Sequence, residues 1–275
     1  MDALLVCLWI CAGTCLAVWL LSLITRDTSW VDRVWSIVPV AYLWVFAAFS
    51  GMDPRLVLMA VLVTLWGARL TFNFARKGGY APGGEDYRWA VLRARMRPWQ
   101  FQVFNLLFIT VYQNVLLLLI TLPAFTALQH AGTPFGALDV VLGVVFLALL
   151  AGETIADQQQ WEFHRWKAEE TAAGRTPHPR FLQTGLFRLS RHPNFFFEQA
   201  QWWVVFLFGA VAAGTVLDWT VIGAVLLTLL FIGSTAFTEG ISLSKYPEYA
   251  DYRRTTSAIV PWFPRRREHS PAAAS

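Results

Sequence analysis

Charged residues are scarce in this chain of 275 residues: Asp, Glu, Lys and Arg make up 15% of it, against 56% hydrophobic residues. Its three cysteines are too few to suggest a disulfide framework. No G-x-G-x-x-G stretch follows a predicted strand, and no Walker sequence is present. The chain therefore lacks the common nucleotide-binding fingerprints of soluble enzymes, and its composition is typical of a membrane protein.

The apolar residues come in long blocks, and a membrane-spanning helix needs about 20 of them in succession. The pattern predicts an all-α polytopic membrane protein with seven spans, at 3–24, 35–50, 54–75, 102–122, 137–156, 195–214 and 217–237. The second block is short, so we expect its helix to begin upstream, near Asp32. The first block follows Asp2 and no basic segment, which favours a retained helix over a signal peptide. We expect residues 1–264 to form one domain and 265–275 a flexible cytoplasmic tail.

Lys and Arg gather in alternate connections between the predicted spans. Apart from Arg55, they lie between spans one and two, around the end of span three and after it, between spans five and six, and after span seven. Because loops rich in Lys and Arg face the cytoplasm, we expect the N-terminus outside and the C-terminus inside. The formal charge of +4 then reflects cytoplasmic loops, and we expect no nucleic-acid partner.

The segment RHPNFFFE at 191–198 places a cation, an imidazole, an amide and a carboxylate at the mouth of the sixth span. Charged groups there are costly and tend to be functional. An interfacial anchor explains Arg191, His192 and the phenylalanines. It explains Asn194 and Glu198 poorly, because these lie four residues apart on one helical face. We therefore favour a ligand site.

The segment 29–35 opens the second span and places an acid, Asp32, between Trp30 and Trp35. An acid at the membrane boundary is a candidate for substrate chemistry. It serves equally well as a helix cap or as a local partner of Arg33. Both interpretations stay open.

The loop 78–89 contains four glycines, which let a backbone approach a ligand closely. Any loop can hold glycines. The string EDYR at 85–88, directly before Trp89, is stronger evidence, because it joins two acids, a phenol and a guanidinium. We interpret this loop as functional.

Two residue series lie on helical faces. Glu153, Asp157, Gln160 and His164 follow the spacing i, i+4, i+7 and i+11 and share one face of the fifth helix. Acids in an apolar helix must point into protein or a water-filled cavity. They lack the paired His or carboxylate spacing of a metal site, so we expect no metal. The three cysteines, at 7, 11 and 15, share a face of the first helix, and we expect them to pack between helices.

Near the C-terminus, Tyr246, Tyr249 and Tyr252 recur every third residue. Such a stripe is usually packing or interfacial anchoring, although it would also suit a flat aromatic ligand. The PWFP sequence at 261–264 is expected to return the chain to the membrane surface.

The polar clusters together predict one cation-rich cytoplasmic cavity. Arginines at its rim suit phosphates, and internal acids and amides suit ribose hydroxyls and a carboxamide. The apolar bundle behind would admit a lipid-like substrate from the bilayer. Because the polar residues cluster on one side and no internal repeat is visible, transport is disfavoured.

At these residues the chain resembles the steroid 5α-reductase superfamily, most closely its bacterial branch of seven-helix proteins of the DUF1295 type. The matching pieces span about residues 29–264 and are 29–35, 84–89, Gln113, Asp157, 185–187, 191–194, Glu198, Tyr249 and the region of Pro261. The Arg-His-Pro-Asn element by itself also occurs in membrane methyltransferases and sterol reductases.

The resemblance implies NADPH-dependent reduction of the carbon–carbon double bond of an enone lipid, such as a Δ4-3-oxosteroid. Hydride would pass to the β-carbon while an acid polarises the carbonyl. The resemblance places Asn194 and Glu198 beside the nicotinamide, and Arg180 near the adenosine. The animal enzymes hold the ketone with a Gln-Glu pair in helix two and a tyrosine in helix three. Here helix two opens with Asp32 and Arg33, and helix three has no tyrosine.

The candidate residues follow from these clusters and the resemblance. The catalytic candidates are Asp32, Glu85 and Tyr87. The cofactor candidates are Arg88, Asp157, His164, Arg165, Arg180, Arg191, His192, Asn194, Glu198, Tyr249 and Arg253. The substrate candidates are Trp30, Trp35 and Gln113.

We expect a monomer in a bacterial inner membrane, with an NADPH site facing the cytoplasm and a steroid or isoprenoid lipid as substrate. The alternative enzyme is a membrane methyltransferase that transfers a methyl group from S-adenosylmethionine to a lipid or isoprenoid. A lipid-binding or scaffold bundle without catalysis is the third possibility.

Overall fold

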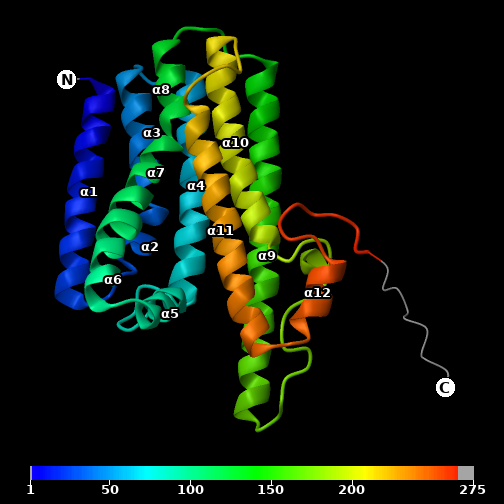
Figure 1. The fold of residues 1–275 in the computed structure, drawn as a ribbon. Helices are drawn as coiled ribbons and strands as arrows, with labels where there is room; N and C mark the ends of the chain where they lie inside the picture. The colour runs from blue at the N-terminus through cyan, green and yellow to red at the C-terminus, as the bar shows by residue number, and fades with distance from the viewer. Residues whose placement is uncertain (1, 266–275) are drawn as a thin grey trace. The chain divides into compact units, whose positions relative to one another are not determined.

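The computed structural model describes residues 2–265, and they form an all-helical chain (Figure 1). Seven helical stretches within this part are long and apolar enough to cross a membrane, which confirms the predicted fold class. The predicted C-terminal tail lies, from residue 266 on, outside the described residues. The direction in which the helices cross the membrane stays a prediction.

Five of the seven spans are single helices, and four of these five overlap most of their predicted ranges without a long extension. They are α1 (Ala3–Thr25), α4 (Pro54–Arg76), α10 (Pro193–Ala213) and α11 (Val221–Lys245). The second span runs over Trp30–Phe49 as α2 (Trp30–Trp35) and α3 (Val38–Phe49), so it begins upstream as expected. The seventh begins and ends later than the predicted 217–237.

The remaining spans are longer than predicted. The fourth, Pro98–Gln129, consists of α6 (Pro98–Phe104), a π-helix η1 (Asn105–Tyr112), α7 (Gln113–Leu119) and α8 (Leu122–Gln129). The fifth is α9 (Ala137–Ala172), which continues well past the predicted end at 156. Shorter helices, α5 (Tyr87–Arg95), the 3₁₀ turn η2 (Gly185–Arg188) and α12 (Tyr249–Thr255), occupy the connections.

Local sequence explains where several helices begin. The Asp2 side chain accepts a hydrogen bond from the Leu4 N–H and caps α1. The Asp53 side chain caps α4 in the same way, and Pro54 follows at the first helical position, where a missing N–H costs nothing. Asp86 caps α5 through the Arg88 N–H.

The chain divides into two compact units. Unit 1 contains the residues up to Ala148 and Ala200–Leu229, and unit 2 contains Leu149–Gln199 and the residues from Leu230 on. The core of unit 1 includes the fully buried side chains of Tyr42, Phe46 and Trp66. The expected single domain stays a prediction.

Glycine lets helices of unit 1 approach closely. A Cβ at Gly67 of α4 would lie 2.4 Å from the Ser36 carbonyl oxygen, and a Cβ at Gly223 of α11 would lie 2.3 Å from the Leu119 carbonyl oxygen. Both contacts are with backbone, which cannot move aside cheaply. A larger residue at either position would push the neighbouring helices apart.

Candidate functional site

The loop 78–89 folds against the start of α2 and joins two of the sequence clusters within unit 1. The Trp89 indole Nε1–H donates to Asp32 Oδ2 at 3.0 Å. The Asp86 N–H donates to the Ser29 hydroxyl at 2.9 Å. Residues 57 positions apart in the sequence are therefore neighbours, and Asp32 lies half-buried beside an indole.

Asp32 and Arg33 do not form the local ion pair that was one interpretation of this segment. The Arg33 guanidinium instead binds Asp27 at 2.7 Å, donates through Nε to the Gly79 carbonyl, and lies over the Trp30 ring at 4.6 Å from its centre. Asp32 is also not the cap of α2, because that position belongs to Ser29. Both structural explanations of Asp32 are therefore wrong, and its carboxylate remains a candidate for substrate chemistry.

Glu85 holds the loop in place. Its carboxylate accepts hydrogen bonds from the Thr28 N–H at 2.9 Å and the Thr28 hydroxyl at 2.7 Å, and from both terminal nitrogens of Arg93. Burial by itself would raise the pKa of Glu85, but the bonds from Arg93 and Thr28 outweigh it and hold that pKa below its usual value. Glu85 is thus an ionised structural acceptor in this arrangement rather than a proton donor.

Arg88 is paired with its own helix cap. Its guanidinium binds Asp86 through Nε at 2.9 Å and Nη2 at 2.7 Å. Burial would lower the pKa of Arg88, but Asp86 raises it above the usual value, so the cation is fixed. Tyr87, next to it, is 50% exposed. Of the three catalytic candidates, Tyr87 is the most exposed and Glu85 the one most engaged by its neighbours.

The three substrate candidates lie on two helices of unit 1. Trp30 and Trp35 are half-buried at opposite ends of α2. The Trp30 indole donates to the Thr25 hydroxyl at 2.8 Å. Gln113 is buried at the start of α7, within the fourth span. Their burial is compatible with a cavity wall and equally with packing.

In unit 2, Arg191 lies at the centre of a buried charge cluster. Its Nε and Nη2 bind Glu239 at 2.6 and 3.1 Å, and its Nη1 donates to the carbonyls of Arg253 and Thr256. His192 Nε2 lies 3.2 Å from Glu239, and Arg253 Nε lies 3.0 Å from it. The cluster ties the mouth of α10 to α11 and to the end of α12.

A backbone clamp fixes the same segment. The Arg191 N–H donates to the Ser257 carbonyl at 2.8 Å, and the His192 N–H to the Ala258 carbonyl at 3.1 Å. The Trp262 N–H donates to the Leu189 carbonyl at 2.9 Å. The chain after α12 therefore runs back along the segment that precedes α10 and holds it.

Beyond this clamp, Asn194 and Glu198 lie one turn apart on α10. Asn194 is half-buried in the first turn, and Glu198 is buried at 8% exposure. Helical geometry puts both on the same face, as predicted from the spacing. The first turn also carries backbone N–H groups without partners inside the helix, which favours negative charge or acceptor groups near it.

The predicted polar face of α9 is a feature of one continuous helix. Glu153 and Asp157 are buried at 1% and 4% exposure, Gln160 is half-buried and His164 is exposed. Arg165 is exposed beyond them, 3.9 Å from Glu169. The face thus grades from buried acids to an exposed histidine over about three turns.

The tyrosine series packs around one phenylalanine. The ring of Phe181 lies 6.1, 4.9 and 5.6 Å from the rings of Tyr246, Tyr249 and Tyr252. Burial raises the pKa of Tyr249 above its usual value. Arg180, next to Phe181, lies at 3.7 Å from Glu248. These contacts support the packing interpretation of the series.

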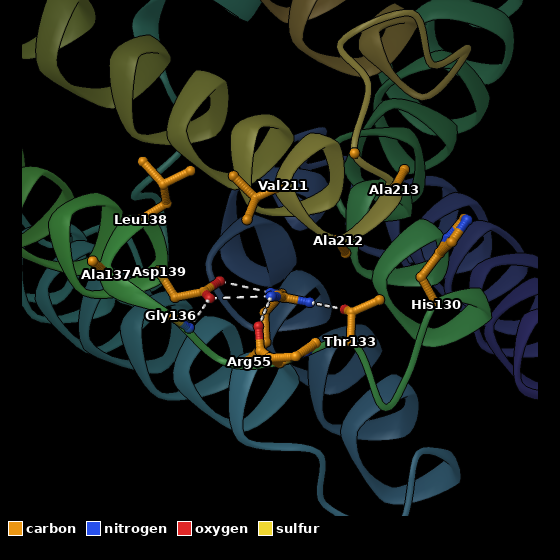
Figure 2. Close-up of a pocket in the computed structure, with 12 residues that line it drawn as sticks. Arg55, His130, Thr133, Gly136, Ala137, Leu138, Asp139, Val211, Ala212 and Ala213 are labelled. Carbon is orange, nitrogen blue, oxygen red and sulfur yellow. Dashed lines mark hydrogen bonds and ion pairs between the residues drawn. The ribbon is translucent and has the colours of Figure 1, made fainter.

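One charge cluster in unit 1 was not predicted from the sequence. Arg55 and Asp139 form a buried ion pair at 2.6 Å, and Arg55 also donates to the Thr133 hydroxyl and the Pro134 carbonyl (Figure 2). The pair borders a largely apolar pocket of about 580 Å³, whose lining includes His130 and Val211. Since every nitrogen of Arg55 donates to protein, the pair is a structural clamp between α4 and α9.

The sequence offered a signal for each missed residue but not its partner. Arg55 was the one cation outside the basic connections, and Glu239 lay two residues beyond the predicted end of the seventh span, which the helix α11 passes. Either position indicates a buried partner. The partner of Arg55 is 84 positions away and that of Glu239 is 48 positions away, so helical spacing cannot identify either one. Among the described residues, no three His, Cys, Asp or Glu side chains lie together as a metal site requires.

Comparisons with known proteins match most of the chain. A family model described as "Protein of unknown function (DUF1295)" covers residues 18–256. A protein of Schizosaccharomyces pombe, described as "Uncharacterized protein C594.04c", is 39% identical over 259 residues, which cover 88% of this chain and 75% of that protein. No solved structure matches the chain. With its seven helices of membrane-spanning length, the chain belongs to the DUF1295 family.

Proposed function

We propose that this protein is an NADPH-dependent membrane reductase that reduces the carbon–carbon double bond of an enone lipid. The substrate class is a Δ4-3-oxosteroid or a related isoprenoid enone. The proposal rests on the site at the mouth of α10 and on the resemblance of its motifs to the steroid 5α-reductase superfamily. It includes an orientation with this site at the cytoplasmic side, where NADPH is available.

The proposal rests mainly on one observation: Asn194 and Glu198 lie at the start of α10, which other contacts hold in position. The Arg191–Glu239 cluster and the backbone clamp hold the start of α10 in place, and Asn194 and Glu198 follow within its first two turns. A carboxamide both donates and accepts hydrogen bonds. An amide and a carboxylate one turn apart are suited to both functions of a nicotinamide carboxamide.

The arginines divide between two tasks. Arg191 is buried and committed to Glu239, so it positions α10 and does not hold phosphate. Arg165, Arg180 and Arg253 have side chains 64%, 40% and 45% exposed. These three are suited to the phosphates of a dinucleotide, because an exposed guanidinium binds phosphate in a bidentate manner. Asp157 is suited to a ribose hydroxyl.

When bound, NADPH supplies a hydride, and the chain must place the enone against it and stabilise the charge that develops on the carbonyl oxygen. Asp32 and Tyr87 are the candidates at the α2 end of unit 1. A carboxylic acid or a phenol can donate a hydrogen bond to that oxygen. Glu85 leaves this role, because its carboxylate is an acceptor for Arg93 and Thr28.

The test is a calorimetric titration of the detergent-solubilised protein with NADPH and with S-adenosylmethionine. We expect NADPH to bind more tightly, and tighter binding of S-adenosylmethionine would instead favour the methyltransferase. Glu198→Gln and Asn194→Ala should each weaken NADPH binding by about tenfold, as expected for loss of one hydrogen bond to a charged or polar ligand group. Glu162→Gln, which removes an exposed carboxylate of the same unit, is the control and should bind like the wild type.

A further inference from the structure

Polar side chains in the middle of unit 1 carry oxygen atoms without hydrogen-bond partners. The atoms are the Tyr42 hydroxyl on α3, Thr110 Oγ1 on η1 and Asn114 Oδ1 on α7. Each residue is at most 1% exposed, and none of the three atoms has a partner among the described residues. All three lie within stretches of membrane-spanning length.

The three residues converge on one helix. The Cys11 thiol of α1 donates to the Asn114 carbonyl at 3.6 Å, and the Tyr42 phenol lies beside the same thiol, whose sulfur is only a weak acceptor for it. The Asn114 Nδ2 donates to the Thr110 carbonyl at 2.8 Å, so the amide is anchored while its oxygen is not. The three residues therefore lie in one region, where α3, η1 and α7 pack against α1.

Such a cluster is unfavourable unless something binds there. A buried polar atom without a partner costs about 1–3 kcal/mol, and a membrane interior offers no water to replace the partner. The π-helix adds to the argument, because its i→i+5 bonding is rare and is frequently found at functional sites. It ends at Tyr112, directly before the α7 turn that carries Asn114.

We infer that Tyr42, Thr110 and Asn114 form the seat for the oxygen-bearing head of a membrane-dissolved lipid. The two hydroxyls are donors to a lipid carbonyl or hydroxyl oxygen, and Asn114 Oδ1 accepts from a lipid hydroxyl. Among the seven spans, α1 has the smallest share of buried residues, 17% of its apolar stretch. It contacts the cluster through the small side chain of Cys11. The lipid therefore enters beside α1.

The identification of that oxygen as an enone carbonyl rests on the proposed reductase function. In that reaction hydride adds to the β-carbon, the π electrons shift so that negative charge reaches the carbonyl oxygen, and the α-carbon then takes a proton from water. A Tyr42 hydroxyl that donates to the oxygen stabilises this charge until the proton reaches the α-carbon. Tyr42 then replaces Asp32 and Tyr87 as the catalytic donor to this oxygen, and Thr110 is its second donor.

The test uses Tyr42→Phe and Thr110→Val, with Tyr112→Phe as the control that removes a phenol hydroxyl outside the cluster. Thermal unfolding is measured without lipid. Binding is then measured for three probes with one ring skeleton: a Δ4-3-oxosteroid, the 3-hydroxysteroid and the hydrocarbon without the oxygen. All measurements are made without NADPH, so a failure of NADPH to bind would refute the proposed reductase and leave this result to stand.

We expect Tyr42→Phe to raise the unfolding midpoint by about 2 °C or more, because it removes an unpaired buried hydroxyl. It should weaken binding of the oxosteroid by about tenfold and leave binding of the hydrocarbon unchanged. Thr110→Val should act in the same direction on the oxosteroid, and Tyr112→Phe should change neither affinity. Unchanged oxosteroid affinity in Tyr42→Phe overturns the inference whatever the midpoint does. A lowered midpoint with unchanged affinity would identify a structural water as the partner.

Discussion

At the scale of single residues, an arginine in this protein takes its role from its partner. Arg55 and Arg191 have side chains less than a tenth exposed, and each binds a buried carboxylate through two nitrogens. Arg253 binds the same Glu239 from a side chain that is 45% exposed. Buried pairs that lose one partner leave an uncompensated charge, whereas exposed pairs contribute little.

Removing Arg191 should therefore destabilise the protein far more than removing Arg253. We expect Arg191→Met to lower the free energy of unfolding by about 3 kcal/mol, and Arg253→Met by less than about 1 kcal/mol. Thermal or denaturant unfolding in a fixed detergent measures both. Equal effects of the two substitutions would contradict the assignment of Arg191 as the positioning residue.

Glu85 should make stability depend on pH in a defined direction. Its folded-state pKa is lowered, so its contribution is present above the unfolded value of about 4.3 and is lost as pH falls through the folded pKa. Glu85→Gln should therefore be less stable than the wild type at pH 7, by about 1–3 kcal/mol, and the difference should shrink below about pH 4. Unfolding midpoints of both proteins across this range test the expectation, with Glu162→Gln as the exposed control. A difference that is constant with pH would mean that the Glu85 charge is not involved.

At the scale of elements, hydropathy located the seven spans, but it could not locate every helix end. The α9 helix continues to Ala172 because its later residues are polar yet good helix formers, and hydropathy senses only the membrane boundary. The π-helix was equally out of reach, because its bonding depends on how the fourth span packs and not on composition. The shared face of Glu153 and Asp157 was predictable, because it follows from helical geometry within one element.

Contacts between elements were the part that could not be predicted. Trp89 contacts Asp32, which is 57 positions away in the sequence, and Arg191 contacts Glu239, which is 48 positions away. A separation of this size in the sequence says nothing about how close two residues lie in space. The sequence therefore indicated which polar residues needed partners in the membrane, while the fold decided which partners they received.

The clamp between α4 and α9 gives a test at this scale. Asp139→Asn should lower the free energy of unfolding by about 3–5 kcal/mol, because it leaves Arg55 buried beside a neutral group. The double substitution Arg55→Met with Asp139→Leu should recover most of that loss, because the buried charges are replaced by apolar side chains. Unfolding measurements on Arg55→Met, on Asp139→Leu and on the variant that combines them form a double-mutant cycle. Additive losses would show that the two residues do not act as a pair.

At the scale of the whole molecule, the distribution of basic residues predicts the orientation of the chain in the membrane, which the helices by themselves do not reveal. The positive-inside rule places the connection between α8 and α9 outside and the connection after α9 in the cytoplasm. In a protein whose three cysteines are replaced, Ala131→Cys should react in intact cells with a maleimide that does not cross membranes. Ala173→Cys should react only after the membrane is opened. Both positions are exposed, so the reverse labelling pattern would contradict the orientation and the cytoplasmic cofactor site.

The central claim concerns the whole protein, because it requires a bound cofactor and a membrane-dissolved enone together. The most direct measurement supplies the protein with a Δ4-3-oxosteroid and with NADPH in which deuterium replaces both hydrogens on the reactive carbon of the nicotinamide ring. Mass spectrometry and NMR then locate the label in the product. We predict one deuterium at the former β-carbon, and about tenfold less labelled product from Glu198→Gln at NADPH concentrations well below saturation. A protein that binds NADPH and the oxosteroid but places no deuterium at that carbon would contradict the account.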